Sequence, residues 1–299
     1  MSGEQPDWVL QGRGQPPQVL WSFSTEGSLI GLEAARESGE LLAADDTGSL
    51  YLVDRKGRFQ FVSHQFRNVR AIVFADTGDF FVVLIGETAI GFYNRKGEEL
   101  WSLDLPEVCL QIALDPRGDY LLICLVDGRN LIIDRNKNTI SRFETVRPLA
   151  FARFLIECPE LIAAAEYGLI CRHQLDGSQV WADKTWSNIG DISIVGSGDA
   201  IWIAGYNHGL QLYDSDGINR ASLVTEGTVN RVSVSYRAER IAASTIEQHL
   251  YWLDGDGELL WGANTETDIR RVIADPLGKR MYCGLNQGRI ICLGWSADR

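Results

Sequence analysis

The stretch Leu250-Tyr-Trp-Leu-Asp-Gly-Asp-Gly-Glu-Leu-Leu-Trp261 places apolar residues on both sides of an Asp-x-x-Gly turn. Side chains that alternate with a period of two, on either side of a Gly that tolerates unusual backbone angles, predict a β-hairpin. The same pattern returns along the chain, so this hairpin is the unit from which the fold is built.

Two sets of residues recur at intervals of 40 positions. The turn glycines are Gly57, Gly97, Gly177, Gly217 and Gly257, with Lys137 at the missing place. The aromatic positions are Trp21, Trp101, Trp181 and Trp261, with Phe61, Ser141 and Ala221 between them. A fixed short period predicts a closed repeat array rather than two ordinary domains. We expect each Trp to pack against the neighbouring unit.

Each repeat also contains an apolar first strand, and these strands define the number of units. They are predicted at Leu29–Ala34, Val69–Phe74, Cys109–Leu114, Leu149–Phe154, Ile189–Ile194, Val229–Val234 and Ile269–Ala274. Four short strands per repeat are typical of a β-propeller blade. The last unit lacks its fourth strand, and Val19–Phe23 has the phase of a fourth strand. The sequence therefore predicts an all-β fold, a seven-bladed β-propeller closed by an N-terminal strand that completes the C-terminal blade. Residues 1–17 form a predicted N-terminal tail, and residues 18–299 a single domain.

The third strands end in an apolar residue followed by Asp or Asn, and the fourth strands end in Trp. Examples are Val53-Asp54, Tyr93-Asn94, Ile133-Asp134, Tyr213-Asp214 and Leu253-Asp254. From Val19 to Leu293 the chain resembles the WD40-like and PQQ-repeat-like β-propellers. No Trp precedes the acidic residue and no Gly-His opens a repeat, as they do in typical WD40 repeats. The adjacent cysteines and calcium ligands of quinoprotein enzymes are not evident either, so the resemblance implies a fold without a quinone cofactor.

Composition restricts the partners. The net charge is -12, which argues against sequence-independent nucleic-acid binding. No basic and apolar leader and no apolar run long enough to cross a bilayer is visible, so we expect a cytoplasmic protein that does not contact membranes. The six cysteines include no C-x-x-C pair, and we expect reduced thiols.

The sequence gives no sign of catalytic chemistry. The four histidines, His64, His173, His208 and His249, fall in different repeats. No nucleophile elbow, phosphate loop or dinucleotide motif occurs. Alternating acids such as Asp254, Asp256 and Glu258 could surround calcium, but Asp and Gly are also ordinary turn residues. We therefore predict no enzyme activity, no cofactor and no metal.

Arginines gather on the first strands and just before them. They are Arg67, Arg70, Arg147, Arg153, Arg231, Arg270 and Arg271, and the acids in the same set are Glu33, Glu107, Asp191 and Asp268. First strands line the central channel of a propeller, with the phases of Val69, Ile72 and Phe74 toward the core. Converging guanidinium groups could form a site for an anion or an acidic peptide. Alternatively, these arginines pair with the nearby acids and with backbone carbonyls.

Aromatic residues form a second candidate site. Trp186 is predicted in the loop before the fifth first strand, and Tyr167 and Tyr206-Asn207-His208 in loops between second and third strands. Trp, Tyr and Arg are enriched where protein interfaces concentrate binding energy. We expect these residues to share one rim, unless they only cover the bases of loops.

These observations favour a non-enzymatic scaffold that binds a protein partner through one face. The main alternative is an anionic small-molecule binder or hydrolase at the channel mouth, with Asp191 or Glu33 as acid or base. A third possibility is a structural subunit that uses the acidic turns at Asp214–Asp216 and Asp254–Glu258.

Overall fold

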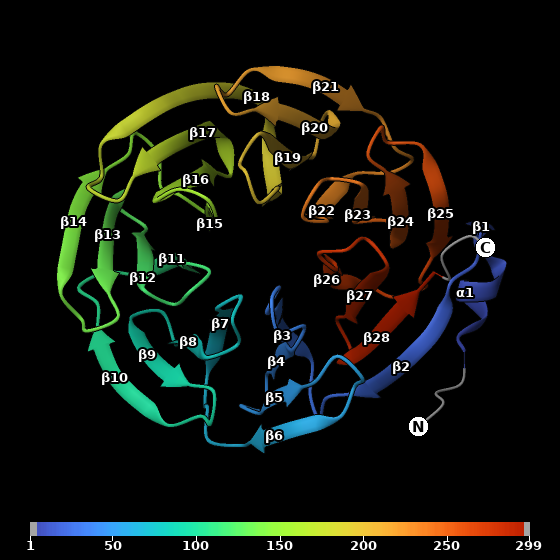
Figure 1. The fold of residues 1–299 in the computed structure, drawn as a ribbon, viewed down its shortest axis with the longest axis horizontal. Helices are drawn as coiled ribbons and strands as arrows, with labels where there is room; N and C mark the ends of the chain where they lie inside the picture. The colour runs from blue at the N-terminus through green and yellow to red at the C-terminus, as the bar shows by residue number, and fades with distance from the viewer. Residues whose placement is uncertain (1–4, 296–299) are drawn as a thin grey trace.

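A computed structural model describes residues 5–295 of the chain. Antiparallel sheets stand around a central axis like the vanes of a wheel, and chain order follows the ring (Figure 1). The β-propeller architecture predicted from the sequence is confirmed. No helix in the described part of the chain is long and apolar enough to span a membrane.

Three consecutive sheets of four strands follow one another after the first outer strand. Their strands are β3 (Leu29–Ala34), β4 (Leu41–Asp45), β5 (Leu50–Val53) and β6 (Phe59–Ser63); β7 (Val69–Phe74), β8 (Phe80–Ile85), β9 (Ala89–Asn94) and β10 (Glu99–Asp104); and β11 (Cys109–Leu114), β12 (Tyr120–Leu125), β13 (Arg129–Asp134) and β14 (Thr139–Glu144).

One long strand joins the next two groups into a single seven-stranded sheet. The strands are β15 (Phe151–Phe154), β16 (Glu160–Ala165), β17 (Tyr167–Gln174), β18 (Gln179–Ile194), β19 (Ala200–Gly205), β20 (Gly209–Asp214) and β21 (Asn219–Leu223). The first part of β18 pairs with β17, and its last part, from Ile189, pairs with β19. The chain thus passes from an outer strand to an inner strand without a loop.

The remaining two sheets contain both chain ends. One holds β1 (Arg13–Gly14), β22 (Val229–Val234), β23 (Arg240–Thr245), β24 (His249–Asp254) and β25 (Leu259–Asn264); the other holds β2 (Gln18–Ser24), β26 (Ile269–Ala274), β27 (Arg280–Leu285) and β28 (Arg289–Gly294). β2 lies antiparallel to β28, with Val19 opposite Leu293. This pairing covers the outer edge of β28, which would otherwise expose unpaired backbone groups.

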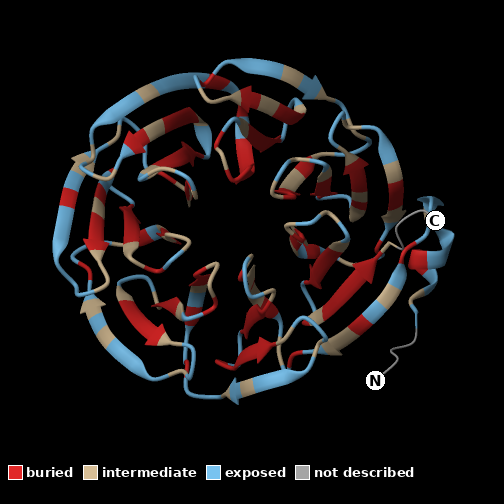
Figure 2. Ribbon diagram, in the orientation of Figure 1, coloured by how far each residue is buried: buried red, intermediate tan, exposed pale blue. Residues whose placement is uncertain are grey.

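The core lies between neighbouring sheets rather than at the axis. Inner and middle strands are mostly buried, whereas the outermost strands show exposed positions to solvent (Figure 2). Side chains at the first and fourth positions of the inner strands, such as Leu29 and Leu32, pack between sheets and are at most 1% exposed. Four cysteines within the sheets, Cys109, Cys171, Cys283 and Cys292, have a pKa raised to about 12 because they are buried, so their thiols remain protonated.

The tryptophans of the outer strands join each sheet to the next. The indole N–H groups of Trp21, Trp101 and Trp181 donate to the carbonyls of Arg55, Arg135 and Ser215, at 3.2, 2.8 and 2.8 Å. Each acceptor lies 34 residues further along the chain. Ser141 makes the same connection through its hydroxyl, which donates to the Leu175 carbonyl at 2.7 Å.

Trp261 departs from this pattern. Its indole N–H has no hydrogen-bond partner among the described residues, and the N-terminal tail packs against its ring. The helix α1 (Asp7–Gln11) buries Trp8 and Val9, and the Trp8 and Trp261 rings lie 6.2 Å apart. Gly12 approaches the Trp261 indole so closely that a Cβ there would clash with it. The part of the tail from residue 5 onward is therefore packed on the domain that was predicted to begin at residue 18.

Candidate functional site

The innermost strand of each group lines the central channel. Six of these strands pair with the second strand of their group in a register that shifts between the first and third residues of the inner strand, as between Val229 and Arg231. Such a bulge re-aims the side chains next to it. Third and fifth residues, including Asp191, Arg271 and Glu33, line a cavity of about 110 Å³ on the axis.

Three arginines on this wall, Arg231, Arg270 and Arg271, form what we call the arginine belt. Arg271 Nη2 donates to Glu33 Oε1 at 2.8 Å, and its Nη1 lies 3.6 Å from Asp191 Oδ2. Burial works against the charged guanidinium, but the two carboxylates outweigh it and raise the pKa of Arg271 above its usual value. Arg271 thus connects β26 to both β3 and β18.

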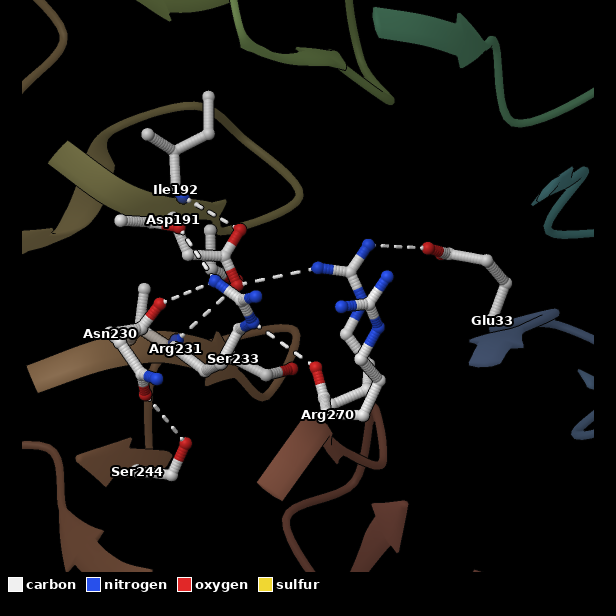
Figure 3. Close-up of polar contacts among 12 residues, drawn as sticks. Glu33, Asp191, Ile192, Asn230, Arg231, Ser233, Ser244 and Arg270 are labelled. Carbon is white, nitrogen blue, oxygen red and sulfur yellow. Dashed lines mark hydrogen bonds and ion pairs between the residues drawn. The ribbon is translucent and has the colours of Figure 1, made fainter. Parts of the chain in front are cut away.

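The other two belt arginines bind backbone carbonyls, and Figure 3 shows the contacts of Arg231. Arg231 donates to Arg270 O at 3.1 Å, Gly190 O at 3.0 Å and Asn230 O at 2.8 Å. Arg270 Nε donates to Ile30 O at 3.1 Å. Burial lowers the pKa of both guanidinium groups, and the neighbouring belt arginines lower it further. Together the belt ties the inner strands of four neighbouring groups across the closure of the ring.

The carboxylates proposed as acid or base are already engaged. Asp191 Oδ1 accepts the Ile192 N–H at 2.9 Å, and Asp191 Oδ2 faces the Val232 N–H at 3.4 Å and Arg271. Glu33 accepts the strongest contact of Arg271. The arrangement matches the alternative in which arginines pair with acids and carbonyls, and it gives no support to a hydrolase at the channel mouth.

The other predicted arginines are dispersed. Arg70 lies 3.6 Å from Glu87, and both side chains are more than half exposed. Arg153 lines the axial cavity and donates to Ala152 O at 3.0 Å. Arg67 and Arg147 are exposed in connecting segments. Arg153 thus shares the cavity with Arg271, and the charge of Arg70 helps to lower the pKa of Arg270, whereas Arg67 and Arg147 make no contribution to the belt.

Two charged residues of the cavity were not singled out from the sequence. Arg36 and Asp76 follow the first strands β3 and β7 and line the same cavity as Arg153. Burial raises the pKa of Asp76 to about 6, although Arg36 opposes the shift. The sequence places Asp76 in a turn, where an Asp has an ordinary structural role.

The aromatic site is exposed as predicted, but the backbone that holds it is different. Trp186 lies within β18, and Tyr167 begins β17, so neither residue is in a loop. Trp186 is 82% exposed, Tyr167 60% and Tyr206 39%. Trp186, Tyr206 and His208 line one hollow of about 590 Å³, and the Lys184 ammonium lies 5.0 Å from the Trp186 ring centre.

Further exposed apolar residues lie on the same face. Because strands alternate in direction, the connections between second and third strands and those between successive groups fall at one end of the propeller. The exposed large apolar residues in these connections or in the strand segments that replace them, which we call the apolar arc, are Val126, Val146, Tyr167, Trp186, Tyr206, Val224 and Ile246. The arc spans the groups from β11 to β25. Four of these residues, Val126, Val146, Val224 and Ile246, were not singled out from the sequence. The same positions in other repeats carry acidic or polar residues, and this difference was the signal that could have identified them.

The other half of this face has a different composition. The corresponding connections from β25 around to β11 carry the acids Glu26, Asp46, Glu87, Glu107, Glu266 and Asp268. The exposed large apolar side chains of the described residues do not include any from these connections. Among the described residues, the exposed large apolar side chains of this face are therefore confined to one half, and the other half is polar.

The acidic turns at the opposite end have a structural role. Asp254 Oδ1 accepts the N–H groups of Asp256 and Glu258, at 3.0 and 2.9 Å, and Asp214 makes the equivalent contacts. Between residues 5 and 295, no group of three His, Cys, Asp or Glu side chains is placed to hold a metal ion.

Comparison with known proteins supports the fold. No family model matches the chain, and no curated protein sequence does. Among solved structures, the Cps50 (Swd1) β-propeller domain from Myceliophteria thermophila is similar, with a TM-score of 0.81 at 13% sequence identity. The match covers 94% of this chain and 100% of that domain. At this identity the likeness establishes the β-propeller fold alone.

Proposed function

We propose that the protein is a non-enzymatic binding platform that holds a protein partner against the apolar arc. The observation that carries this proposal is the position of the arc, because its seven side chains lie on one half of one face and leave the other half of that face polar. Monomeric proteins rarely expose contiguous apolar patches without an interaction to bury them. Trp and Tyr are also the side chains most often found at interface hot spots.

We assign seven blades to the propeller. If β18 is divided at Ile189, the six hydrogen-bonded sheets become seven units of four strands, with β1 as an addition. The unit at the seam then consists of β26, β27, β28 and the N-terminal β2. This arrangement resembles WD40-like and PQQ-repeat-like repeats.

We further propose that the protein acts in the cytoplasm and that its partners are proteins rather than nucleic acids or membranes. The net charge of -12 disfavours contact with phosphate backbones and anionic lipids. Cysteines buried as free thiols agree with a reducing compartment.

The test uses two variants of the tagged full-length chain. Trp186→Ser combined with Val224→Ser removes the two large side chains at the centre of the arc. Leu277→Ser is the matched control, because Leu277 is 59% exposed in a turn after the inner strand, at the opposite end. Affinity purification with quantitative mass spectrometry should show partners lost from the arc variant and retained by the control. Partners that remain with both variants would rule out this face.

A further inference from the structure

We infer that the segment that docks on the arc is an extended chain rich in apolar and basic residues, with a Lys or Arg over Trp186. This inference rests on the proposed function and concerns the chemistry of the partner. It concerns the two hollows on either side of Val224.

The shape of the site favours a long and narrow occupant. The hollow beside Trp186 has a volume of about 590 Å³, and a second hollow of about 690 Å³ lies against β24 and β25. Val224 and Thr225 line both hollows, so the two form one path across neighbouring sheets. Val224 itself is 90% exposed and stands between them.

Unpaired polar atoms along this path favour an extended backbone. In four connections a threonine hydroxyl donates to the carbonyl two residues ahead, as Thr185 does to Ser187 O at 3.1 Å and Thr265 to Thr267 O at 2.7 Å. Thr225 occupies the same repeat phase, but its buried hydroxyl has no partner in the described part of the chain. Gln211, which is 7% exposed and lines the first hollow, has an unpaired Oε1. An extended chain offers free N–H and C=O groups to such atoms, whereas a helix uses its own internally.

Acids outnumber the basic residues beside the arc, where Arg13, Arg147 and Lys184 also lie, and this balance favours a basic occupant. Glu166 precedes Tyr167, Glu226 follows Val224 by two residues, and Glu247 follows Ile246. Neither Glu166 nor Glu226 has an ion pair among residues 5–295. The Trp186 ring already attracts one ammonium group, that of Lys184 at 5.0 Å, and a partner cation could take its place. Complementary charge guides association and discriminates between partners.

The test is selection from a phage library of random linear dodecapeptides on the immobilised full-length protein. Peptides that bind wild type but not Trp186→Ser should be enriched in Lys or Arg together with aromatic or aliphatic residues. Glu166→Lys combined with Glu226→Lys should lose these peptides. Gln211→Leu should weaken a selected synthetic peptide about fivefold, because one hydrogen bond is removed while the side-chain size is kept.

The outcomes separate this inference from the proposed function. Trp186-dependent peptides that are acidic would overturn the inferred charge and leave the docking face standing. Unchanged affinity in Gln211→Leu would overturn the extended backbone contact. Failure to enrich any Trp186-dependent peptide would overturn the linear segment, while the purification experiment judges the face independently.

Discussion

The arginine belt and the aromatic members of the apolar arc are residue types that interfaces favour, yet the surroundings of belt and arc differ completely. Belt arginines donate to carbonyls and carboxylates of neighbouring inner strands at 2.8–3.1 Å. Arc side chains such as Trp186 and Val224 are 82% and 90% exposed. Residue type alone therefore does not mark a binding site; the available contacts within the fold decide.

The difference follows from distance to the axis. Inner strands converge, so a long guanidinium side chain reaches the next sheet and finds an acceptor there. The connections on the face that carries the apolar arc lie further from the axis, and a side chain that points outward from them meets solvent. The experiments below test this contrast, beginning with the largest effect.

Arg271→Met should destabilise the protein by about 3–5 kcal/mol, because it leaves Glu33 and Asp191 without their buried counter-charge. Urea unfolding followed by tryptophan fluorescence measures the loss. Arg147→Met, at an exposed arginine of a connecting segment, is the control and should change stability by less than about 0.5 kcal/mol. Equal stabilities of the two variants would contradict a structural role for the belt.

Trp101→Ala should cost about 3 kcal/mol, because it removes a large packed side chain and the hydrogen bond to Arg135 O. Trp186→Ala should stay within about 0.5 kcal/mol of wild type, because that ring is 82% exposed. Thermal unfolding of the pair compares two tryptophans of the same chain. A large loss in Trp186→Ala would show that the arc supports the fold rather than a partner.

Asp76→Asn should stabilise the protein by about 3 kcal/mol above pH 6 and have little effect below pH 4. Burial raises the folded-state pKa of Asp76 from 3.8 to about 6, so the folded protein holds this proton more tightly than the unfolded chain. The Asp76 carboxyl therefore lowers the stability of the folded protein progressively as the pH rises from 3.8 to about 6. The full difference corresponds to about 3 kcal/mol, and the opposing attraction to Arg36 is already included in that pKa.

The measurement is urea unfolding of wild type and Asp76→Asn across pH 4 to 8. Asp79→Asn in the same turn is the control, since Asp79 is exposed. A stability difference that does not vary with pH would show that Asp76 titrates normally in the folded protein.

Much of the architecture was visible in the sequence because the repeat is strict. The 40-residue spacing located the inner strands and the Trp contacts between sheets, and Lys137 adopts the left-handed φ of 69° that glycine supplies in the other turns. The course of β18 could not be predicted in this way. Its residues Lys184–Asn188 continue as a strand and pair with β17, although the same phases form connections elsewhere.

The candidate site was predicted in part. Trp186, Tyr206 and His208 line one hollow and Tyr167 is exposed, but their role in binding stays a prediction, whereas Arg231 and Arg271 are bound within the wall. The packing of Trp8 against Trp261 also depends on a contact between the chain's beginning and a distant strand.

The sequence by itself determined the repeating strands, the apolar layers between sheets and the turns, because these depend on side chains a few positions apart. Tertiary structure alone decided which charges are neutralised and which apolar groups remain exposed. Those outcomes depend on distances between residues far apart in the chain, such as Arg271 and Glu33, and closure of the ring sets those distances.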